Sequence, residues 1–97
     1  MLTKKKVLST IKDHAEEISV YGVKKVGIFG SFARSKQDSK SDVDVLVEFN
    51  KGAKTFDNYI ELKFFLEKLL RRKVDLVIKE ALKAGIKNRV LSEVQYA

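Results

Sequence analysis

The sequence has no cysteine and only one histidine among its 97 residues. The missing cysteines exclude disulfide bonds, thiolate metal ligands and thiol nucleophiles, and one imidazole cannot form the cluster that a zinc site uses. Any metal ion that this chain binds must therefore be held by oxygen atoms.

Proline is also absent, and no repeat, low-complexity tract or linker-like segment interrupts the chain. No apolar run approaches the length that crosses a bilayer, and the basic residues near the start are followed by mixed sequence where a signal peptide has a continuous apolar core. We therefore expect a single cytoplasmic domain over residues 1–97, with no membrane contact and no second hydrophobic core.

Acidic residues are in the minority, since 20 Lys and Arg stand against 13 Asp and Glu, for a net charge of +7. Such a balance suits a polyanionic partner, for example nucleotide phosphates, nucleic acid or an acidic protein surface. Most of the basic residues, however, are scattered lysines that solubilise helix faces, and Arg71-Arg72-Lys73 falls where a helix C-terminus favours cations. Charge alone therefore favours a solvated surface over a nucleic-acid-binding one.

Hydrophobic periodicity predicts helices and strands in turn along the chain. Apolar residues recur every three or four positions after Thr3 and after Thr55, each a plausible N-cap, whereas the intervening runs are short and β-branched. The expected helices cover residues 3–22, 55–69 and 86–97, and the expected strands cover 23–29, 42–49 and 73–78. This order predicts an α/β (α+β) domain, with a small mixed sheet of about three strands covered by helices.

Two aspartates stand one residue apart at the head of the second expected strand. Successive strand residues face opposite sides of a sheet, so Asp42 and Asp44 share one face, about 6.6 Å apart along the strand. Val43, Val45 and Val47 then turn toward the core. Taken alone, such a pair of aspartates is solvated surface charge as often as it is part of a binding site. Here, however, it follows a Gly-Ser pair at residues 30–31.

A third aspartate, Asp75, lies out of phase with the apolar residues of the third expected strand. If this strand lies beside the second, three carboxylates share one patch, and at least one must protonate unless a cation neutralises them. Oxygen ligands favour Mg²⁺ or Mn²⁺, and two such ions about 3.5 to 4 Å apart catalyse in-line displacement at phosphorus. We assign Asp42 and Asp44 to bridging both ions, and Asp75 to the ion that carries the nucleophile.

The pair Gly30-Ser31 closes the first expected strand and opens a short helical turn that ends at Arg34. Glycine lets the backbone approach a phosphate closely, and the serine hydroxyl can bond a β- or γ-phosphate oxygen. Arg34 lies one turn further on and can clamp the same phosphates. Together with the aspartates, this turn predicts a site for a metal-bound nucleoside triphosphate.

The motifs resemble the nucleotidyltransferase superfamily that includes DNA polymerase beta: Gly30-Ser31, ten intervening residues, Asp42-Val43-Asp44, and later Asp75 in an apolar strand. The stretches GSFARSKQDSKSDVDVLVEF, KVDLVI and IKNRVLSEVQYA are most similar to the minimal nucleotidyltransferases, the antitoxins of HEPN/MNT toxin–antitoxin pairs. The similarity spans nearly the whole chain. One departure is Ser35, where family members commonly have glycine, and we expect it to change the loop geometry modestly.

The resemblance implies a polymerase beta-like fold and Mg²⁺-dependent transfer of AMP from ATP to an acceptor. In this subfamily the acceptor is a tyrosine of a partner HEPN toxin, so the chain would be the antitoxin of a type VII-like pair and form a hetero-oligomer with the toxin. Three alternatives stay open: a binding antitoxin that neutralises its partner by occlusion, transfer to a small molecule such as an aminoglycoside, and a basic nucleic-acid-binding module.

Overall fold

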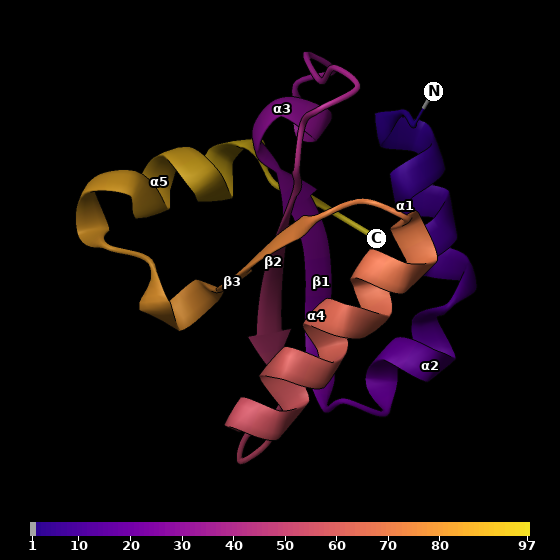
Figure 1. The fold of residues 1–97 in the computed structure, drawn as a ribbon. Helices are drawn as coiled ribbons and strands as arrows, with labels where there is room; N and C mark the ends of the chain where they lie inside the picture. The colour runs from indigo at the N-terminus through magenta and orange to yellow at the C-terminus, as the bar shows by residue number, and fades with distance from the viewer. Residues whose placement is uncertain (1) are drawn as a thin grey trace.

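The computed structural model describes residues 2–97 and contains a four-stranded mixed sheet with helices on both faces (Figure 1). The strand order is β3-β2-β1-β4; β1 is antiparallel to β2 and β4, and β2 is parallel to β3. The elements are α1 (Lys4–Asp13), α2 (Ala15–Ser19), β1 (Val23–Phe29), α3 (Gly30–Ala33), β2 (Val43–Phe49), α4 (Phe56–Leu70), β3 (Val74–Ile78), the 3₁₀ turn η1 (Lys79–Ala81), α5 (Ala84–Glu93) and β4 (Gln95–Tyr96). The predicted α/β class is confirmed, with one strand more than expected.

The main core lies between the sheet and helices α1, α2 and α4. Val43, Val45 and Val47 alternate along β2 and are fully buried there with Leu62 and Leu66 of α4. Each such side chain contributes about 1.5–3 kcal/mol when it leaves water. The even-numbered residues of β2 consequently face the opposite side of the sheet, over which α5 extends (Figure 1).

Both predicted threonine caps are present. The Thr3 hydroxyl accepts a hydrogen bond from the Lys6 N–H at 3.2 Å, and the Thr55 hydroxyl accepts one from the Asn58 N–H at 3.1 Å. The first helix is nevertheless interrupted, because His14 leaves the helical region (φ −110°, ψ 22°) and separates α1 from α2. The expected single helix is therefore two shorter ones.

The last predicted helix extends too far, because α5 ends at Glu93 and the chain turns into β4. This strand pairs with β1, where a Cβ at Gly27 would come within 2.7 Å of the Gln95 carbonyl oxygen. The glycine therefore allows the C-terminal segment to approach β1. β4 has only two residues, which is too short for an alternation of apolar and polar side chains to be recognised. The sequence therefore did not predict this strand.

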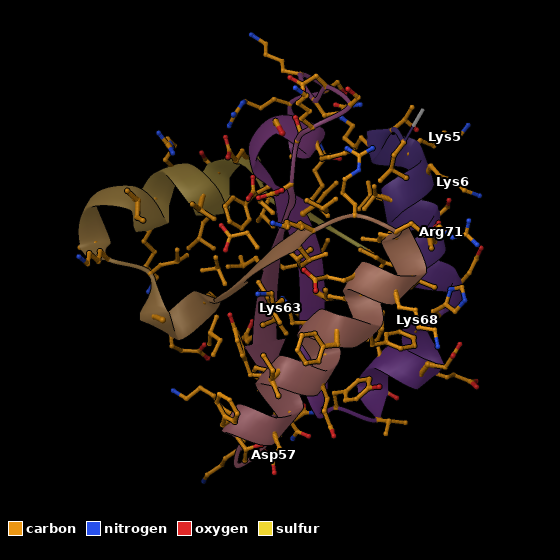
Figure 2. All side chains as sticks on the ribbon, viewed as in Figure 1. Lys5, Lys6, Asp57, Lys63, Lys68 and Arg71 are labelled. Atoms are coloured by element: carbon orange, nitrogen blue, oxygen red, sulfur yellow. The ribbon has the colours of Figure 1, made fainter. Side chains whose placement is uncertain are left out.

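The outer surfaces of the helices are charged, as the sequence led us to expect. Lys5 and Lys6 of α1, Lys68 of α4 and the adjoining Arg71 are exposed, and Figure 2 shows their side chains directed away from the sheet. This distribution agrees with a solubilising role for much of the positive charge. Within residues 2–97 no helix combines the length and apolar character needed to cross a membrane.

Candidate active site

Three aspartates gather where β2 and β3 begin. The parallel pairing of these strands places Asp44 directly opposite Asp75. Asp42 comes immediately before β2, which begins at Val43 and not at Asp42 as expected. Asp42 and Asp75 are exposed, whereas Asp44 is half-buried. The expectation that the second and third strands are neighbours is thus confirmed, and it brings the acidic positions to one face.

The electrostatics of Asp44 reflect this crowding. Its pKa is raised from 3.8 to about 6, first by burial and then by the negative charges of Asp75 and Asp42. Arg34 opposes the rise, and Glu93 adds to it. Neighbouring carboxylates raise one another's pKa by repulsion, and a cation bound between them removes this repulsion and stabilises their ionised forms.

The donor set therefore fits a divalent cation such as Mg²⁺: every donor is a carboxylate oxygen, and Asp44 responds to the charge of both other aspartates. As the side chains lie, no three Asp, Glu or His groups in residues 2–97 converge tightly enough to enclose an ion. The backbone register already aligns Asp44 with Asp75. The aspartate side chains would therefore have to rotate, without a change of register, to enclose an ion.

The turn after β1 packs directly against this acidic face. It forms the helix α3, which begins at Gly30, one residue earlier than expected. Gly30 has a left-handed φ of +72°, and a Cβ on it would overlap the carboxylate of Asp44. The position therefore requires glycine for its backbone conformation and for its contact with Asp44. The fully buried Phe32 anchors the turn in the core.

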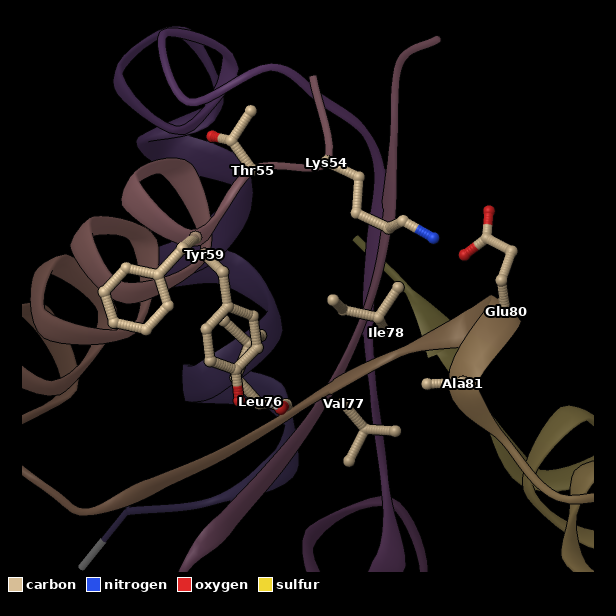
Figure 3. A pocket seen from close by; sticks show the side chains of 9 residues that line it. Lys54, Thr55, Tyr59, Leu76, Val77, Ile78, Glu80 and Ala81 are labelled. Carbon is tan, nitrogen blue, oxygen red and sulfur yellow. Dashed lines mark hydrogen bonds between the residues drawn. The ribbon is translucent and has the colours of Figure 1, made fainter. Parts of the chain in front are cut away.

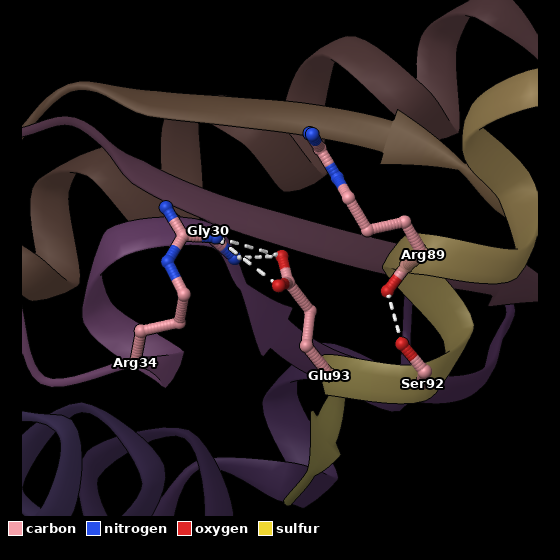
Figure 4. A network of polar contacts seen from close by, with 5 residues as sticks. All are labelled: Gly30, Arg34, Arg89, Ser92 and Glu93. Atoms are coloured by element: carbon pink, nitrogen blue, oxygen red, sulfur yellow. Dashed lines mark hydrogen bonds and ion pairs between the residues drawn. The ribbon is translucent and has the colours of Figure 1, made fainter.

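Arg34 and Gly30 share a partner that the sequence did not suggest. The Arg34 Nη1 lies 3.1 Å from both carboxylate oxygens of Glu93, and the Gly30 N–H donates to Glu93 Oε1 at 3.0 Å (Figure 4). Burial pushes the pKa of Glu93 upward, but the bonds from Gly30 and Arg34, with the charge of Arg89, outweigh it and hold the pKa below its ordinary value.

The sequence carried no signal for Glu93, because the expected helix over residues 86–97 places it in the helix interior. In the structure it is the last residue of α5, where the helix macrodipole disfavours negative charge. An acid at that position needs a compensating partner, and the structure supplies one from α3.

A second arginine holds the loop that leads to Asp42. The Arg72 Nη1 donates to the carbonyl oxygens of Asp38 at 3.2 Å and Ser41 at 3.0 Å, and its guanidinium lies 5.5 Å from the centre of the Phe32 ring. Arg72 lies just after α4, where a helix C-terminus favours cations. Its contacts also connect the end of α4 to the loop before β2.

Ser35, the departure from the family pattern, has a left-handed φ of 56°. Glycine adopts this conformation freely, whereas a residue with a Cβ pays a conformational penalty of about 1 kcal/mol. The usual glycine at this position thus has a backbone explanation. The turn forms with serine in this chain, and the modest change in loop geometry stays a prediction.

A separate hollow of about 550 Å³ lies beside the edge strand β3 (Figure 3). Its lining comes from the start of α4, from the second half of β3 and from η1, and includes none of the three aspartates. Tyr59 stands in it and donates its hydroxyl to the Leu76 carbonyl oxygen at 2.6 Å. The hollow is therefore distinct from the acidic face.

Comparison with known proteins agrees with this geometry. Residues 8–97 match the nucleotidyltransferase domain family. The protein adenylyltransferase MntA of Thermococcus cleftensis is 42% identical over 97 residues, which cover 99% of this chain and 97% of the relative.

Solved structures share the fold. One assigned to the minimal nucleotidyltransferases superposes with a TM-score of 0.84 at 30% identity, covering 97% of this chain and 95% of the other. A chain of a toxin–antitoxin complex with AMP-PNP has a TM-score of 0.69 at 21% identity, covering 98% of this chain and 72% of the other. The chain therefore belongs to the nucleotidyltransferase family and is an enzyme of the minimal nucleotidyltransferase type.

Proposed function

We propose that the chain is a protein adenylyltransferase that transfers AMP from ATP to a tyrosine of a HEPN toxin and serves as the antitoxin of that toxin. The observation that carries the catalytic part is the alignment of Asp44 with Asp75 beside the Gly30-Ser31 turn. The 42% identity with a protein adenylyltransferase supports a protein acceptor. The antitoxin role rests on the resemblance of the motifs to the minimal nucleotidyltransferases of HEPN/MNT pairs.

Asp42, Asp44 and Asp75 are the residues that would hold Mg²⁺, because their carboxylate oxygens are the ligands that this cation prefers. When bound, the ions neutralise the triphosphate and lower the pKa of the acceptor hydroxyl. Asp44 must be ionised for this role. With a pKa of about 6 it is mostly ionised at neutral pH even before a cation arrives.

The reaction is a displacement at the α-phosphorus of ATP. The tyrosine oxygen forms a bond to this phosphorus, the bond to the oxygen that bridges to the β-phosphate breaks, and pyrophosphate leaves with the electron pair. Ser31 and Arg34 would bind the β- and γ-phosphates, so their donors stabilise the negative charge that grows on the leaving group. The tyrosine proton is lost to solvent or to Asp75.

The test uses the purified chain, Mg²⁺, ATP and the protein encoded by the neighbouring gene. The mass of that protein should increase by one or more AMP units. Asp44→Asn keeps the side-chain shape and removes its charge, so it should abolish the increase, whereas Glu61→Gln, at an exposed position on α4, should leave it intact. No increase under any condition contradicts the proposal.

A second function, neutralisation by occlusion without catalysis, is favoured by the apolar side chains that remain exposed. Val20 is 79% exposed, Phe56 76% and Phe64 59%. Such side chains supply contact area to a protein partner. In this case Asp42→Asn/Asp44→Asn would still protect cells from the toxin and would still co-purify with it, whereas the catalytic proposal requires the double variant to lose protection.

A further inference from the structure

Glu93 joins two segments that are distant in the sequence. Its carboxylate receives the Gly30 N–H at 3.0 Å and the Arg34 guanidinium at 3.1 Å (Figure 4). These donors belong to the turn that we propose for phosphate binding, 63 and 59 residues away along the chain. The C-terminal helix thereby reaches into the site.

The contact is partly shielded from water. The Glu93 side chain is 18% exposed and that of Arg34 is 46% exposed, so solvent weakens the ion pair, whereas the bond from the Gly30 N–H is part-buried. The carboxylate also lies at the unfavourable end of α5 and close enough to Asp44 to raise the pKa of that residue. The bonds from Gly30 and Arg34 outweigh both unfavourable interactions, since they hold the pKa of Glu93 below its ordinary value, so the charged carboxylate stabilises this junction.

Glu93 leaves the other donors of the site available. It contacts Arg34 through Nη1, and within residues 2–97 the Nε and Nη2 of Arg34 and the hydroxyl of Ser31 have no hydrogen-bond partner. A guanidinium has five N–H donors arranged in a plane. Holding Nη1 with both carboxylate oxygens therefore restrains the guanidinium while Nε and Nη2 stay available.

We infer that Glu93 is a positioning residue of the nucleotide site: its carboxylate holds the Gly30 backbone and the Nη1 of Arg34, so that the remaining donors of Arg34 and the Ser31 hydroxyl are presented to a bound triphosphate. The inference rests on the proposed function, because a nucleotide is what the turn is proposed to bind. Glu93 acts through Gly30 and Arg34 and does not itself contact the nucleotide.

The test measures the affinity for AMP-PNP in the presence of Mg²⁺ by calorimetry, for the wild-type chain and for Glu93→Ala, Arg34→Ala and the double variant. Glu93→Ala should weaken binding about tenfold, since charge-assisted bonds align the donors. Glu93→Ala should cost less affinity in the Arg34→Ala background than in the wild-type chain, because the part of its effect that passes through the guanidinium is already lost and only the Gly30 contact remains. Glu93→Gln should retain part of the affinity, since its amide oxygen still accepts the Gly30 N–H.

Melting curves, recorded alongside, identify a temperature at which every variant is folded. A purely structural role would lower the melting temperature and leave the affinity at that temperature unchanged, which overturns the inference. Tighter binding by Glu93→Ala, as expected of a carboxylate that competes with phosphate, or fully additive losses in the double variant overturn it too. A wild-type chain that binds no AMP-PNP with Mg²⁺ overturns the proposed function together with the inference.

Discussion

Asp44 of β2 lies directly opposite Asp75 of β3 in a parallel pair. The register is held by the alternation around each aspartate, because Val43 and Val45 pair with Val74 and Leu76 in the core. A slip of one residue would bury an aspartate and expose the apolar side chains. The hydrophobic pattern that folds the sheet thus also aligns the proposed catalytic carboxylates.

Asp44→Asn should stabilise the metal-free chain at neutral pH. The pKa of Asp44 is about 6 in the folded chain against an ordinary 3.8, so the folded state binds this proton more tightly than the unfolded state. Stability is therefore lost as pH rises from about 4 through 6, and the asparagine variant avoids the loss. Allowing for solvent screening of a half-buried group, we expect a gain of about 1–2 kcal/mol at pH 7.5.

Urea denaturation of both chains at pH 4 and pH 7.5 measures this difference. The two chains should be nearly equally stable at pH 4, where Asp44 is protonated in the folded state. A gain of the same size at both pH values would mean that charge repulsion is not its cause.

Gly30→Ala should cost more than the same change at Gly52. Both glycines have left-handed φ angles, +72° and +81°, but a Cβ at position 30 overlaps the Asp44 carboxylate, whereas nothing lies within 4 Å of one at position 52. Gly52→Ala should lower the free energy of unfolding by about 1 kcal/mol. Gly30→Ala should lower it further and abolish AMP transfer; equal losses and intact transfer would show that the close packing is unimportant.

Ser35→Gly should stabilise the chain. Serine at a φ of 56° carries a penalty that glycine lacks, and this gain exceeds the entropy that glycine adds to the unfolded state. The expected increase is about 0.5–1 kcal/mol by chemical denaturation. Ser39→Gly is the matched control in the same loop: its backbone φ is not left-handed, so the substitution should be neutral or destabilising.

Arg72→Ala should loosen the loop before β2. It removes the donors to the Asp38 and Ser41 carbonyl oxygens, so hydrogen exchange over residues 35–42 should accelerate and ATP binding with Mg²⁺ should weaken. The exposed neighbour Arg71 serves as the control, because Arg71→Ala removes a charge from the same end of α4. Identical exchange in the two variants would speak against this anchoring role.

The sequence predicted those features that depend on local pattern. Alternation around Asp44 and Asp75 placed both carboxylates on one face, and the Thr3 and Thr55 hydroxyls cap helices as expected. The Gly30-Ser31 turn was located to within one residue.

Contacts between distant segments were not predictable in this way. The bond between Glu93 and Gly30 depends on where α5 docks, and α5 has only one buried residue, Val90, to indicate its orientation. Arg72 faces the loop because the αL backbone of Arg71 ends α4 there. Strand β4 can pair with β1 because Gly27 leaves room for it, and this room is a property of the partner strand that the sequence of β4 does not show.

Parallel reactions with ATP labelled at the α-phosphorus or at the γ-phosphorus test the central claim most directly. Each contains Mg²⁺, the partner protein and either the wild-type chain or Asp42→Asn/Asp44→Asn. With the wild-type chain, the α-label should appear on a tyrosine of the partner and the γ-label should leave as pyrophosphate, while the double variant transfers neither. Transfer of the γ-label, or equal α-label transfer by the variant, would contradict a carboxylate-dependent transfer of AMP.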